Sequence, residues 1–386
     1  MFRHSHLAFL LCALEACSSA DHDAPATHAS SDPPLSQTTV TDLQQTLDAV
    51  VAAKVAPGVS LFFERPGYAA WSGTSGVANT ETSVPLVPAA RCRAGSILKL
   101  AVATAVLQLV ERGELDLDAR LPSLLPTDVT SRVANADAIT LRMLLDHTSG
   151  VADWDDSDFD ALVAADPAHV WSFDELIDRA HALPVPFAPG VGWAYSNTDY
   201  TLLGAIIERV TGKSWRSVVR ERVFARAGMT ESSLPEEGNV RCDGCARGYA
   251  PIDDELVDIT EVDPSMAGPA GGDALVTTPA DLGRLIDAHV TGMLFDDPGT
   301  LALALDFTAA PVPEWEQTGY GLGIAHYEAN GVELIGHLGG TAGFQSFVFY
   351  QPDTGATLSG YMNRNGDFAA FVLPALAAVG RALGGS

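Results

Sequence analysis

The stretch Gly95-Ser96-Ile97-Leu98-Lys99 opens a long apolar segment that continues through Val110 and stops at Gly113. Between Leu100 and Val110 only Thr104 and Gln108 are polar, which predicts a helix buried on nearly all sides. Glycine commonly ends helices, so Gly113 marks the end of this one. We expect the remaining elements to pack around this helix, with Ser96 at its mouth.

Ser96 and Lys99 lie three residues apart, so on a helix their side chains share one face. In a first helical turn, backbone N–H groups and the helix dipole favour negative charge. A lysine whose charged form is disfavoured by burial can take a proton from serine near neutral pH. We therefore predict Ser96 as a nucleophile and Lys99 as its base. A serine cap followed by a lysine that reaches the surface is the alternative interpretation.

The composition excludes several classes of partner. The chain has 386 residues, 47% of them hydrophobic and 18% charged, which is typical of a globular protein with two domains or one large domain with an insertion. Its formal net charge of −27 repels nucleic acid and anionic lipid. We expect no nucleic-acid partner and no obligate protein partner.

The N-terminus is predicted to direct export. Residues 1–16 resemble a signal peptide built on the short apolar run Leu7–Leu14. Cys17 stands where bacterial lipoproteins are cleaved and lipidated, and plain cleavage nearby is the alternative. Residues 17–40 are rich in Ser, Ala, Pro, Asp and His and are expected to form a flexible tether. The mature protein is then periplasmic, or held at a bacterial membrane by a lipid on Cys17.

Apolar periodicity and turn signals predict the secondary structure. The spacing of apolar residues indicates a helix over Asp42–Lys54, and two β-type runs around Pro66-Gly67 indicate a hairpin of Gly58–Phe63 and Tyr68–Gly73. Further helices are predicted over Thr140–Asp146, Ser172–Ala182, Thr198–Val210, Ser214–Ala227, Thr278–Val290 and Asp367–Leu383. Strands with antiparallel turn chemistry are predicted over Gly321–Tyr327, Val332–Gly336, Phe344–Tyr350 and Ala356–Met362.

These elements predict an α+β fold. Helix and hairpin at the start, and strands and helix at the end, indicate an antiparallel sheet flanked by N- and C-terminal helices. We expect residues 41–105 and 267–386 to form the two halves of this α/β sheet domain. Residues 106–266 are expected to form a mainly helical inserted domain.

Two further groups of residues are given non-catalytic interpretations. Cys242 and Cys245 are expected to form a local disulfide, because no second pair is present to complete a zinc site. Cys92 is interpreted as a half-buried packing thiol. The five acids between Asp153 and Asp160 match no calcium loop and are interpreted as a solvated acidic loop.

Two later motifs carry polar groups suited to a cleft. Tyr195-Ser196-Asn197 precedes a predicted helix, and His337-Leu338-Gly339-Gly340 follows a predicted strand. Gly339 would let a substrate approach the backbone closely. Each motif alone also fits a packed tyrosine or an ordinary strand end.

In order and approximate spacing, Ser96-x-x-Lys99, Tyr195-x-Asn197 and His337-x-Gly339 resemble the motifs of serine β-lactamase-like hydrolases. That family includes class C β-lactamases, DD-peptidases and esterases. The resemblance covers most of residues 40–384 and includes Leu144-Leu145-Asp146-His147-Thr148-Ser149-Gly150 and Gly336-His337-Leu338-Gly339-Gly340-Thr341. It implies a β-lactamase/transpeptidase-like fold.

The resemblance also implies roles for individual residues. Ser96 attacks a carbonyl, Lys99 takes its proton, and Tyr195, with a phenol pKa lowered by nearby cations, passes the proton to the leaving group. The backbone N–H groups of Ser96 and Gly340 hold the oxyanion. Asn197 holds a substrate amide. His337 and Gly339 contribute to substrate binding, His147 is structural, and no cofactor or metal is implied.

Departures from the family pattern concern the substrate. His337 stands where class C β-lactamases carry lysine, and its ordinary pKa of about 6.5 predicts titration in the working range. Leu338 and Gly340 replace hydroxyl residues that often bind a substrate carboxylate, which predicts an apolar pocket. We expect an exported serine hydrolase that cleaves amides or esters, as D-Ala peptide carboxypeptidases or esterases do. A penicillin-binding module that acylates without turnover and a true β-lactamase are the alternatives.

Overall fold

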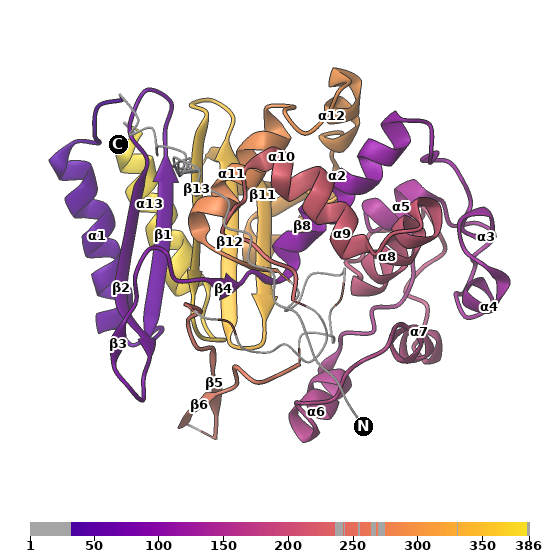
Figure 1. The fold of residues 1–386 in the computed structure, drawn as a ribbon, viewed down its shortest axis with the longest axis horizontal. Helices are drawn as coiled ribbons and strands as arrows, with labels where there is room; N and C mark the ends of the chain where they lie inside the picture. Colours follow the sequence, from indigo (N-terminus) through magenta and orange to yellow (C-terminus); the bar gives the residue numbers. More distant parts are fainter. Residues whose placement is uncertain are drawn as a thin grey trace, which may run out of the picture.

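The computed structural model describes residues 32–383 apart from 236–241, 243, 254, 264–267, 269–274 and 330. Its centre is a nine-stranded sheet in the order β3-β2-β1-β13-β12-β11-β10-β9-β8, with every neighbouring pair antiparallel (Figure 1). The strands are β1 Gly58–Glu64, β2 Trp71–Asn79, β3 Val84–Pro85, β8 Thr308–Val312, β9 Gln317–Tyr320, β10 Ala325–Ala329, β11 Val332–Thr341, β12 Phe344–Gln351 and β13 Ala356–Met362.

The two ends of the chain meet in this sheet. Strand β1 lies between β2 and β13, with Val59 opposite Met362 and Glu64 opposite Thr357. Helix α1 (Gln37–Ala52) packs beside α13 (Ala369–Ala382) on one face, as Figure 1 shows at its left. Alternate side chains of the strands fill the core under these two helices. The predicted sheet with terminal helices is therefore confirmed.

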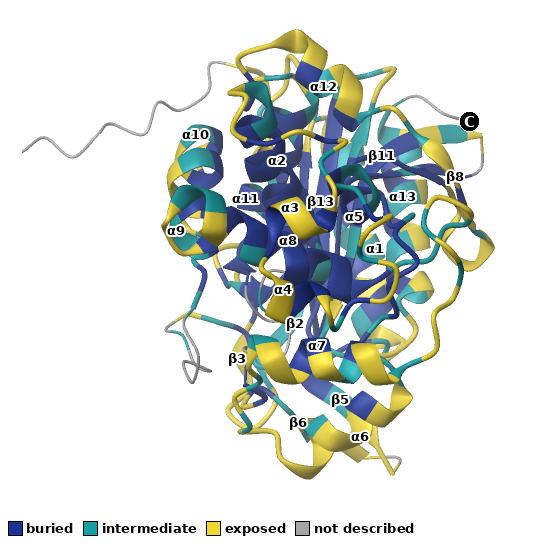
Figure 2. Ribbon diagram, turned by 90° about the vertical axis from the view of Figure 1, so that its right-hand side faces the viewer, coloured by how far each residue is buried: buried dark blue, intermediate teal, exposed yellow. Residues whose placement is uncertain are grey.

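The other face of the sheet is covered by helices that bury a larger core. Helix α11 (Pro279–Val290) lies on β1, β12 and β13. Helix α2 (Leu98–Glu111) is buried at every residue from Leu98 to Leu109, as the apolar segment predicted. Figure 2 shows α2, α8 and α11 as the buried centre of this layer, with α6 and α7 exposed at its rim.

The remaining elements lie outside the nine-stranded sheet. They are β4 Cys92–Arg93, η1 Gly95–Ile97, α3 Leu121–Leu124, α4 Thr127–Thr130, α5 Leu141–Leu145, α6 Ser157–Ala165, α7 Phe173–Ala182, α8 Asn197–Thr211, α9 Trp215–Val219, α10 Ala225–Ala227, β5 Tyr249–Ile252, β6 Glu255–Asp258, β7 Val276–Thr277, α12 Pro298–Ala304 and η5 Pro313–Trp315. A π-helical turn, η2 (Arg220–Phe224), interrupts the helix predicted over Ser214–Ala227.

Two predicted elements differ in the structure. The strand predicted over Gly321–Tyr327 begins only at Ala325, because Gly323 has φ +82° and a Cβ there would lie 2.2 Å from the Cβ of Ala103 on α2. The chain must turn where it crosses α2, so β9 ends before this point and β10 begins after it. The acidic loop predicted over Asp153–Asp160 is partly helical, because the Asp156 side chain caps α6.

Within the part of the chain that the structure describes, no helix is both long enough and apolar enough to cross a membrane. The predicted signal peptide, residues 1–16, and Cys17 lie outside the described residues. The boundaries of the two sheet halves and the helical insertion stay predictions.

Candidate active site

Ser96 lies in the short helix η1 between β4 and α2. Strand β4 pairs with β7, the Ala94 amide donates to Leu275 O, and the Ala94 carbonyl accepts from Ser346 Oγ on β12, so the backbone that leads to Ser96 is held on both sides. Gly95 has φ +57°, and a Cβ on it would lie 2.7–2.9 Å from backbone atoms of Gly340. A side chain at position 95 would therefore separate Ser96 from β11.

Lys99 is fully buried, with Nζ 3.1 Å from Ser96 Oγ and 2.7 Å from Asn197 Oδ1. Burial lowers the pKa of this amine to about 7, although the carboxylates of Asp153, Asp155 and Asp199 act in the opposite direction. A substantial fraction of Lys99 is therefore neutral at neutral pH. Its geometry and proton affinity suit a base for Ser96.

The ring of Tyr195 faces the Lys99 amine, with Nζ 4.7 Å from the ring centre. Its hydroxyl hydrogen-bonds Ser96. The expectation that nearby cations lower its pKa is wrong, because burial raises the pKa of the phenol well above its ordinary value and outweighs the Ser96 hydrogen bond. Tyr195 keeps its proton and can pass one along by hydrogen bonding.

Asn197 links Lys99 to two acids that the sequence interpretation assigned to solvent. Its Oδ1 accepts from Lys99, and its Nδ2 donates to Asp153 Oδ2 at 3.1 Å and Asp155 Oδ2 at 3.3 Å. Its backbone N–H donates to Asp153 Oδ1 at 3.0 Å. Asp155 is exposed and Asp153 is half-buried, so the segment is partly solvated as predicted, but both acids also bind Asn197, and no spacing signal in the sequence connects them with it.

His337 is placed near the site but does not titrate as predicted. It is 4% exposed, its Nδ1 hydrogen-bonds Leu338 O, and its Nε2 lies 3.0 Å from the Tyr320 hydroxyl. Burial lowers its pKa to about 3. The imidazole is therefore neutral across the working range, with Nδ1–H donating and Nε2 accepting.

Gly339 and Gly340 have different functions in the structure. A Cβ at Gly339 would lie 2.1 Å from Ala94 O and 2.4 Å from Ser346 Oγ. The glycine was expected to make room for a substrate, but it makes room for the Ala94 backbone instead. Gly340 faces open space beside Ser96, and β10 pairs no further along β11 than Gly336. The free backbone edge at Gly340 suits the oxyanion position that the family pattern implies.

Leu338 points away from Ser96. It lies in a separate cavity of about 280 Å³ on the α13 face of the sheet, where it contacts the core around Phe349. Side chains alternate along β11, so Leu338 takes the opposite face from His337 and Gly339. The prediction that Leu338 makes the substrate pocket apolar is therefore wrong.

Ser96, Asn197 and Gly340 line one cavity of about 570 Å³. Two carboxylates, Asp155 and Asp160, line it from the α6 side, and burial raises the pKa of Asp155 to about 6. No lysine or arginine is found among the described residues that line it. Its apolar wall consists of Trp154, Val163, Ala164, Pro167, Ile252, Ile259, Val262 and Ala342.

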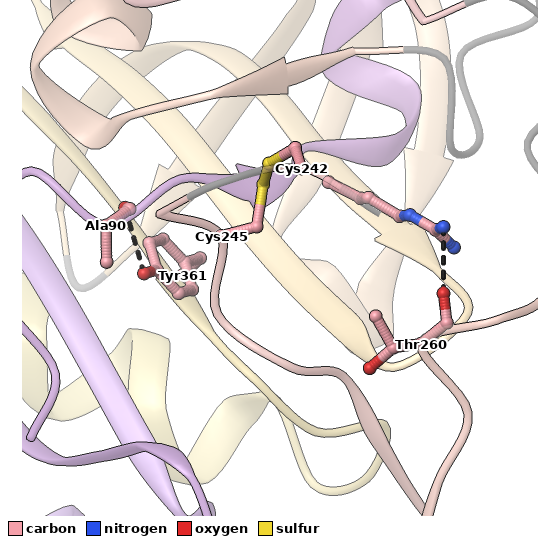
Figure 3. Close-up of a disulfide and its surroundings, with 6 residues drawn as sticks. Ala90, Cys242, Cys245, Thr260 and Tyr361 are labelled. Carbon is pink, nitrogen blue, oxygen red and sulfur yellow. Dashed lines mark hydrogen bonds between the residues drawn. A yellow bond between two sulfur atoms is a disulfide. The ribbon is translucent and has the colours of Figure 1, made fainter. Parts of the chain in front are cut away.

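The cavity wall at Ile259 and Val262 is hydrogen-bonded to β4, the strand that leads to Ser96. Arg93 on β4 is buried and donates to Thr260 O at 2.9 Å and Val262 O at 3.0 Å. Figure 3 shows the hydrogen bond to Thr260 O near the Cys242–Cys245 disulfide. The predicted pairing of Cys242 with Cys245 is confirmed. Beside the disulfide, the Tyr361 hydroxyl donates to Ala90 O (Figure 3).

Cys92 was expected to be half-buried, but it is fully buried, and burial raises the pKa of its thiol.

His147 lies behind the site, as its structural interpretation implies. Its Nδ1 is 3.0 Å from Asp199 Oδ2, and its ring centre is 4.5 Å from that of Tyr195. Ser149 Oγ donates to the other Asp199 oxygen at 2.6 Å. Within the described residues, no group of three or more His, Cys, Asp or Glu is arranged to hold a metal ion.

The arrangement can form an acyl-enzyme. Ser96 has a base within hydrogen-bond reach, a phenol that can relay its proton, and a backbone edge for the oxyanion. These groups come from the three predicted motifs, which the fold brings together from positions near 96, 195 and 337.

Comparison with known proteins agrees with this geometry. A family model described as Beta-lactamase matches residues 43–381. Penicillin-binding protein 4 of Amycolatopsis lactamdurans is 32% identical over 73% of this chain and 74% of its own length. Esterase EstB of Burkholderia gladioli is 34% identical over 53% of this chain and 55% of the esterase.

Solved structures extend the likeness over most of the chain. A D-stereospecific amidohydrolase from Streptomyces sp. superposes with a TM-score of 0.77 at 30% identity, covering 86% of this chain and 97% of that chain. The D-amino acid amidase of Ochrobactrum anthropi SV3, in complex with D-phenylalanine, superposes with a TM-score of 0.78 at 29% identity, covering 89% and 99%.

Proposed function

This chain belongs to the Beta-lactamase family and is a serine hydrolase, and on that premise we propose that it cleaves amides or esters that carry no free carboxylate beside the scissile bond. The observation that carries the proposal is the charge of the cavity wall. Asp155 and Asp160 line the cavity, and no described lining residue is basic. A substrate carboxylate would be repelled there, whereas an ester, an amide or an ammonium group would not.

The reaction begins when neutral Lys99 takes the Ser96 proton and Oγ attacks the substrate carbonyl. The Ser96 and Gly340 N–H groups stabilise the oxyanion, a type of contact that contributes roughly 10²–10³ in rate. Tyr195, which stays protonated, donates its proton to the leaving amine or alkoxide as it receives one from Lys99. Water then hydrolyses the acyl-enzyme.

The names of the relatives support this class of substrate. An esterase, a D-aminopeptidase and a D-amino acid amidase are among the proteins that resemble the chain. The penicillin-binding relative supports a second candidate, a module that is acylated by β-lactams and turns over poorly. The two candidates differ in whether the acyl-enzyme accumulates.

Export is part of the proposal. It is supported by the apolar run near the N-terminus and by the Cys242–Cys245 disulfide, a bond typical of oxidising compartments. Fractionation of bacterial cells expressing the wild type and Cys17→Ala tests it. Wild type is expected in the membrane fraction and Cys17→Ala in the soluble periplasm; cytoplasmic wild type would contradict export.

The activity is tested with a neutral p-nitrophenyl ester, a D-amino acid amide, a D-Ala-D-Ala peptide and the same peptide with its C-terminus amidated. We expect kcat/KM to be about 10- to 100-fold higher for the amidated peptide than for the free acid, the range that one lost charge interaction gives. A preference for the free acid would contradict the proposal.

Labelling of the same samples with fluorescent penicillin distinguishes a hydrolase from the second candidate, a penicillin-binding module that turns over poorly. Lasting label on the wild type with no turnover of any substrate would identify a penicillin-binding module. Ser96→Ala and Lys99→Arg are the matched controls, because the first lacks the nucleophile and arginine stays protonated. Both are expected to lose turnover, and wild-type activity in either would contradict the assigned mechanism.

A further inference from the structure

Asp153 stands where nothing in the sequence motifs requires an acid, yet it binds Asn197, the residue that accepts a hydrogen bond from Lys99. Its Oδ1 accepts the backbone N–H of Asn197 at 3.0 Å, and its Oδ2 accepts Asn197 Nδ2 at 3.1 Å. The same oxygen atom Oδ1 accepts the Asp155 amide at 3.1 Å. The carboxylate thereby grips both the main chain and the side chain of Asn197.

This grip decides which end of the Asn197 amide faces Lys99. With Nδ2 bonded to Asp153 and Asp155, only Oδ1 is directed at Nζ, 2.7 Å away. Without an acceptor on that side, the amide could turn and present its NH2 group to the amine. Two donors would then oppose each other in a buried place, and Lys99 would lose an acceptor that orients it toward Ser96.

We propose that Asp153 is a positioning residue, which fixes the Asn197 amide so that Lys99 is held against Ser96 and keeps the proton affinity that its role as base requires. The inference rests on the proposed function in one respect, that Lys99 is the base.

The charges around Lys99 support this assignment. The groups that face the amine from all packed elements are Ser96, Asp153, Asp155, Asn197, Asp199, Tyr195, Tyr200, His147 and His337. The two histidines are buried with lowered pKa values and burial raises the pKa of both phenols, so these four groups stay uncharged near pH 7. The acids that act on Lys99 are Asp153, Asp155 and Asp199, and of these Asp153 and Asp155 also contact the Asn197 amide.

The sign of the effect follows from these anions. An ionised Asp153 favours the ammonium form of Lys99 and raises its pKa against the effect of burial. Removing the charge should lower that pKa, so the rise of kcat/KM with pH should have its midpoint at a lower pH. Because burial raises the pKa of Asp153 itself to about 7, the midpoint belongs to the pair and not to either group alone.

The test compares Asp153→Asn with Asp158→Asn, which removes the same charge from the same acidic segment at an exposed position outside the cavity lining. With a neutral ester, we expect Asp153→Asn to lower the acid-limb midpoint by about one pH unit and the plateau of kcat/KM at least about tenfold. Asp158→Asn should match the wild type. An unchanged midpoint in Asp153→Asn, or an equal shift in both variants, would overturn the inference.

A double-variant cycle distinguishes positioning from a general structural effect. If Asp153 acts through the amide, adding Asp153→Asn to Asn197→Ala should cost little beyond Asn197→Ala alone, whereas independent effects would multiply. If Asp153→Asn does not fold, Asp155→Asn replaces it, because Asp155 makes the longer bond to Nδ2 and should shift the midpoint in the same direction. Multiplying effects, or no shift in Asp155→Asn, would count against the inference.

Failure of this inference can be told apart from failure of the proposed function. If Lys99→Arg retains activity, the base is another group and the proposed mechanism fails. If Lys99→Arg is inactive and Asp153→Asn keeps the wild-type profile, the mechanism stands and only the positioning role of Asp153 is lost.

Discussion

The Tyr320 hydroxyl and His337 Nε2 lie 3.0 Å apart in a buried contact, and the other imidazole nitrogen is bonded to Leu338 O. The Leu338 carbonyl can only accept, so Nδ1 of His337 carries the proton, and burial keeps the imidazole neutral with the lone pair of Nε2 toward the Tyr320 hydroxyl. The histidine is thus held as an uncharged part of the wall that supports β11.

The first prediction is that His337 does not shape the pH profile. His337→Gln, which keeps an amide able to reach Tyr320, is expected to change kcat/KM without moving the midpoint of its pH dependence between about pH 5 and 8. The measurement is kcat/KM for a neutral ester across that range, with Asp153→Asn as the variant expected to move it. Loss of an inflection in His337→Gln would contradict this prediction.

The second prediction concerns Leu338, which lies on the α13 face of the sheet. Leu338→Thr should leave the ratio of kcat/KM for amidated and free-acid peptides unchanged and lower the free energy of unfolding by about 1–3 kcal/mol, through lost apolar contacts. Thr341→Val is the comparison variant, because Thr341 lines the catalytic cavity and should change that ratio. A changed ratio in Leu338→Thr would show that this side chain reaches the substrate.

The third prediction uses the two neighbouring glycines. Gly339→Ala places a methyl group 2.1 Å from Ala94 O, so Ala94 and with it Ser96 must move. We expect a loss of about 1–3 kcal/mol in stability and roughly 10²-fold in kcat/KM. Gly340→Ala meets no atom within 4 Å and should melt at the wild-type temperature. Equal melting temperatures for the two variants would refute the close contact.

The fourth prediction concerns stability against pH. His289 is buried, its Nδ1 lies 2.9 Å from Thr104 Oγ1, and burial lowers its pKa to about 3. Between about pH 6.5 and 3 the unfolded chain binds a proton at this residue and the folded protein does not. The contribution of His289 to the free energy of unfolding is therefore fully present above about pH 6.5 and is lost as pH falls below that value.

His289→Asn, which can keep the bond to Thr104, removes the titrating group. Its unfolding free energy should fall less than that of the wild type between pH 6.5 and 4.5, by up to about 1.4 kcal/mol per pH unit. Urea titrations at three pH values measure the difference, and the acids that titrate nearby are common to both proteins. Parallel slopes would show that His289 is charged in the fold.

The sequence predicted the parts of this molecule that depend on local pattern. The apolar segment after Ser96 became the buried helix α2, and the motif order placed Ser96, Lys99 and Tyr195 within one site. Alternation along β11 places Leu338 and Gly339 on opposite faces, but the sequence pattern does not tell which face meets the nucleophile. That choice depends on α13, which is distant in sequence.

The errors at charged and aromatic groups have a common physical cause. The sequence predicted that His337 titrates in the working range and that nearby cations lower the pKa of Tyr195, whereas burial lowers the first pKa and raises the second. Burial depends on packing between segments that lie far apart in the sequence. The contact of Asp153 with Asn197, 44 residues apart, is of the same kind.

The pairing of β1 with β13 has a consequence for how the chain folds. Strand β1 can pair with the adjacent β2 early, but its second partner is β13, where Val59 meets Met362, so one edge of β1 stays open until this distant strand arrives. Contacts of such sequence separation slow folding, because the loop entropy is lost before the contact forms. The apolar core that α1 and β1 share with β13 and α13 can therefore close only when segments from opposite ends of the fold have met, which makes the docking of β13 a late step in folding.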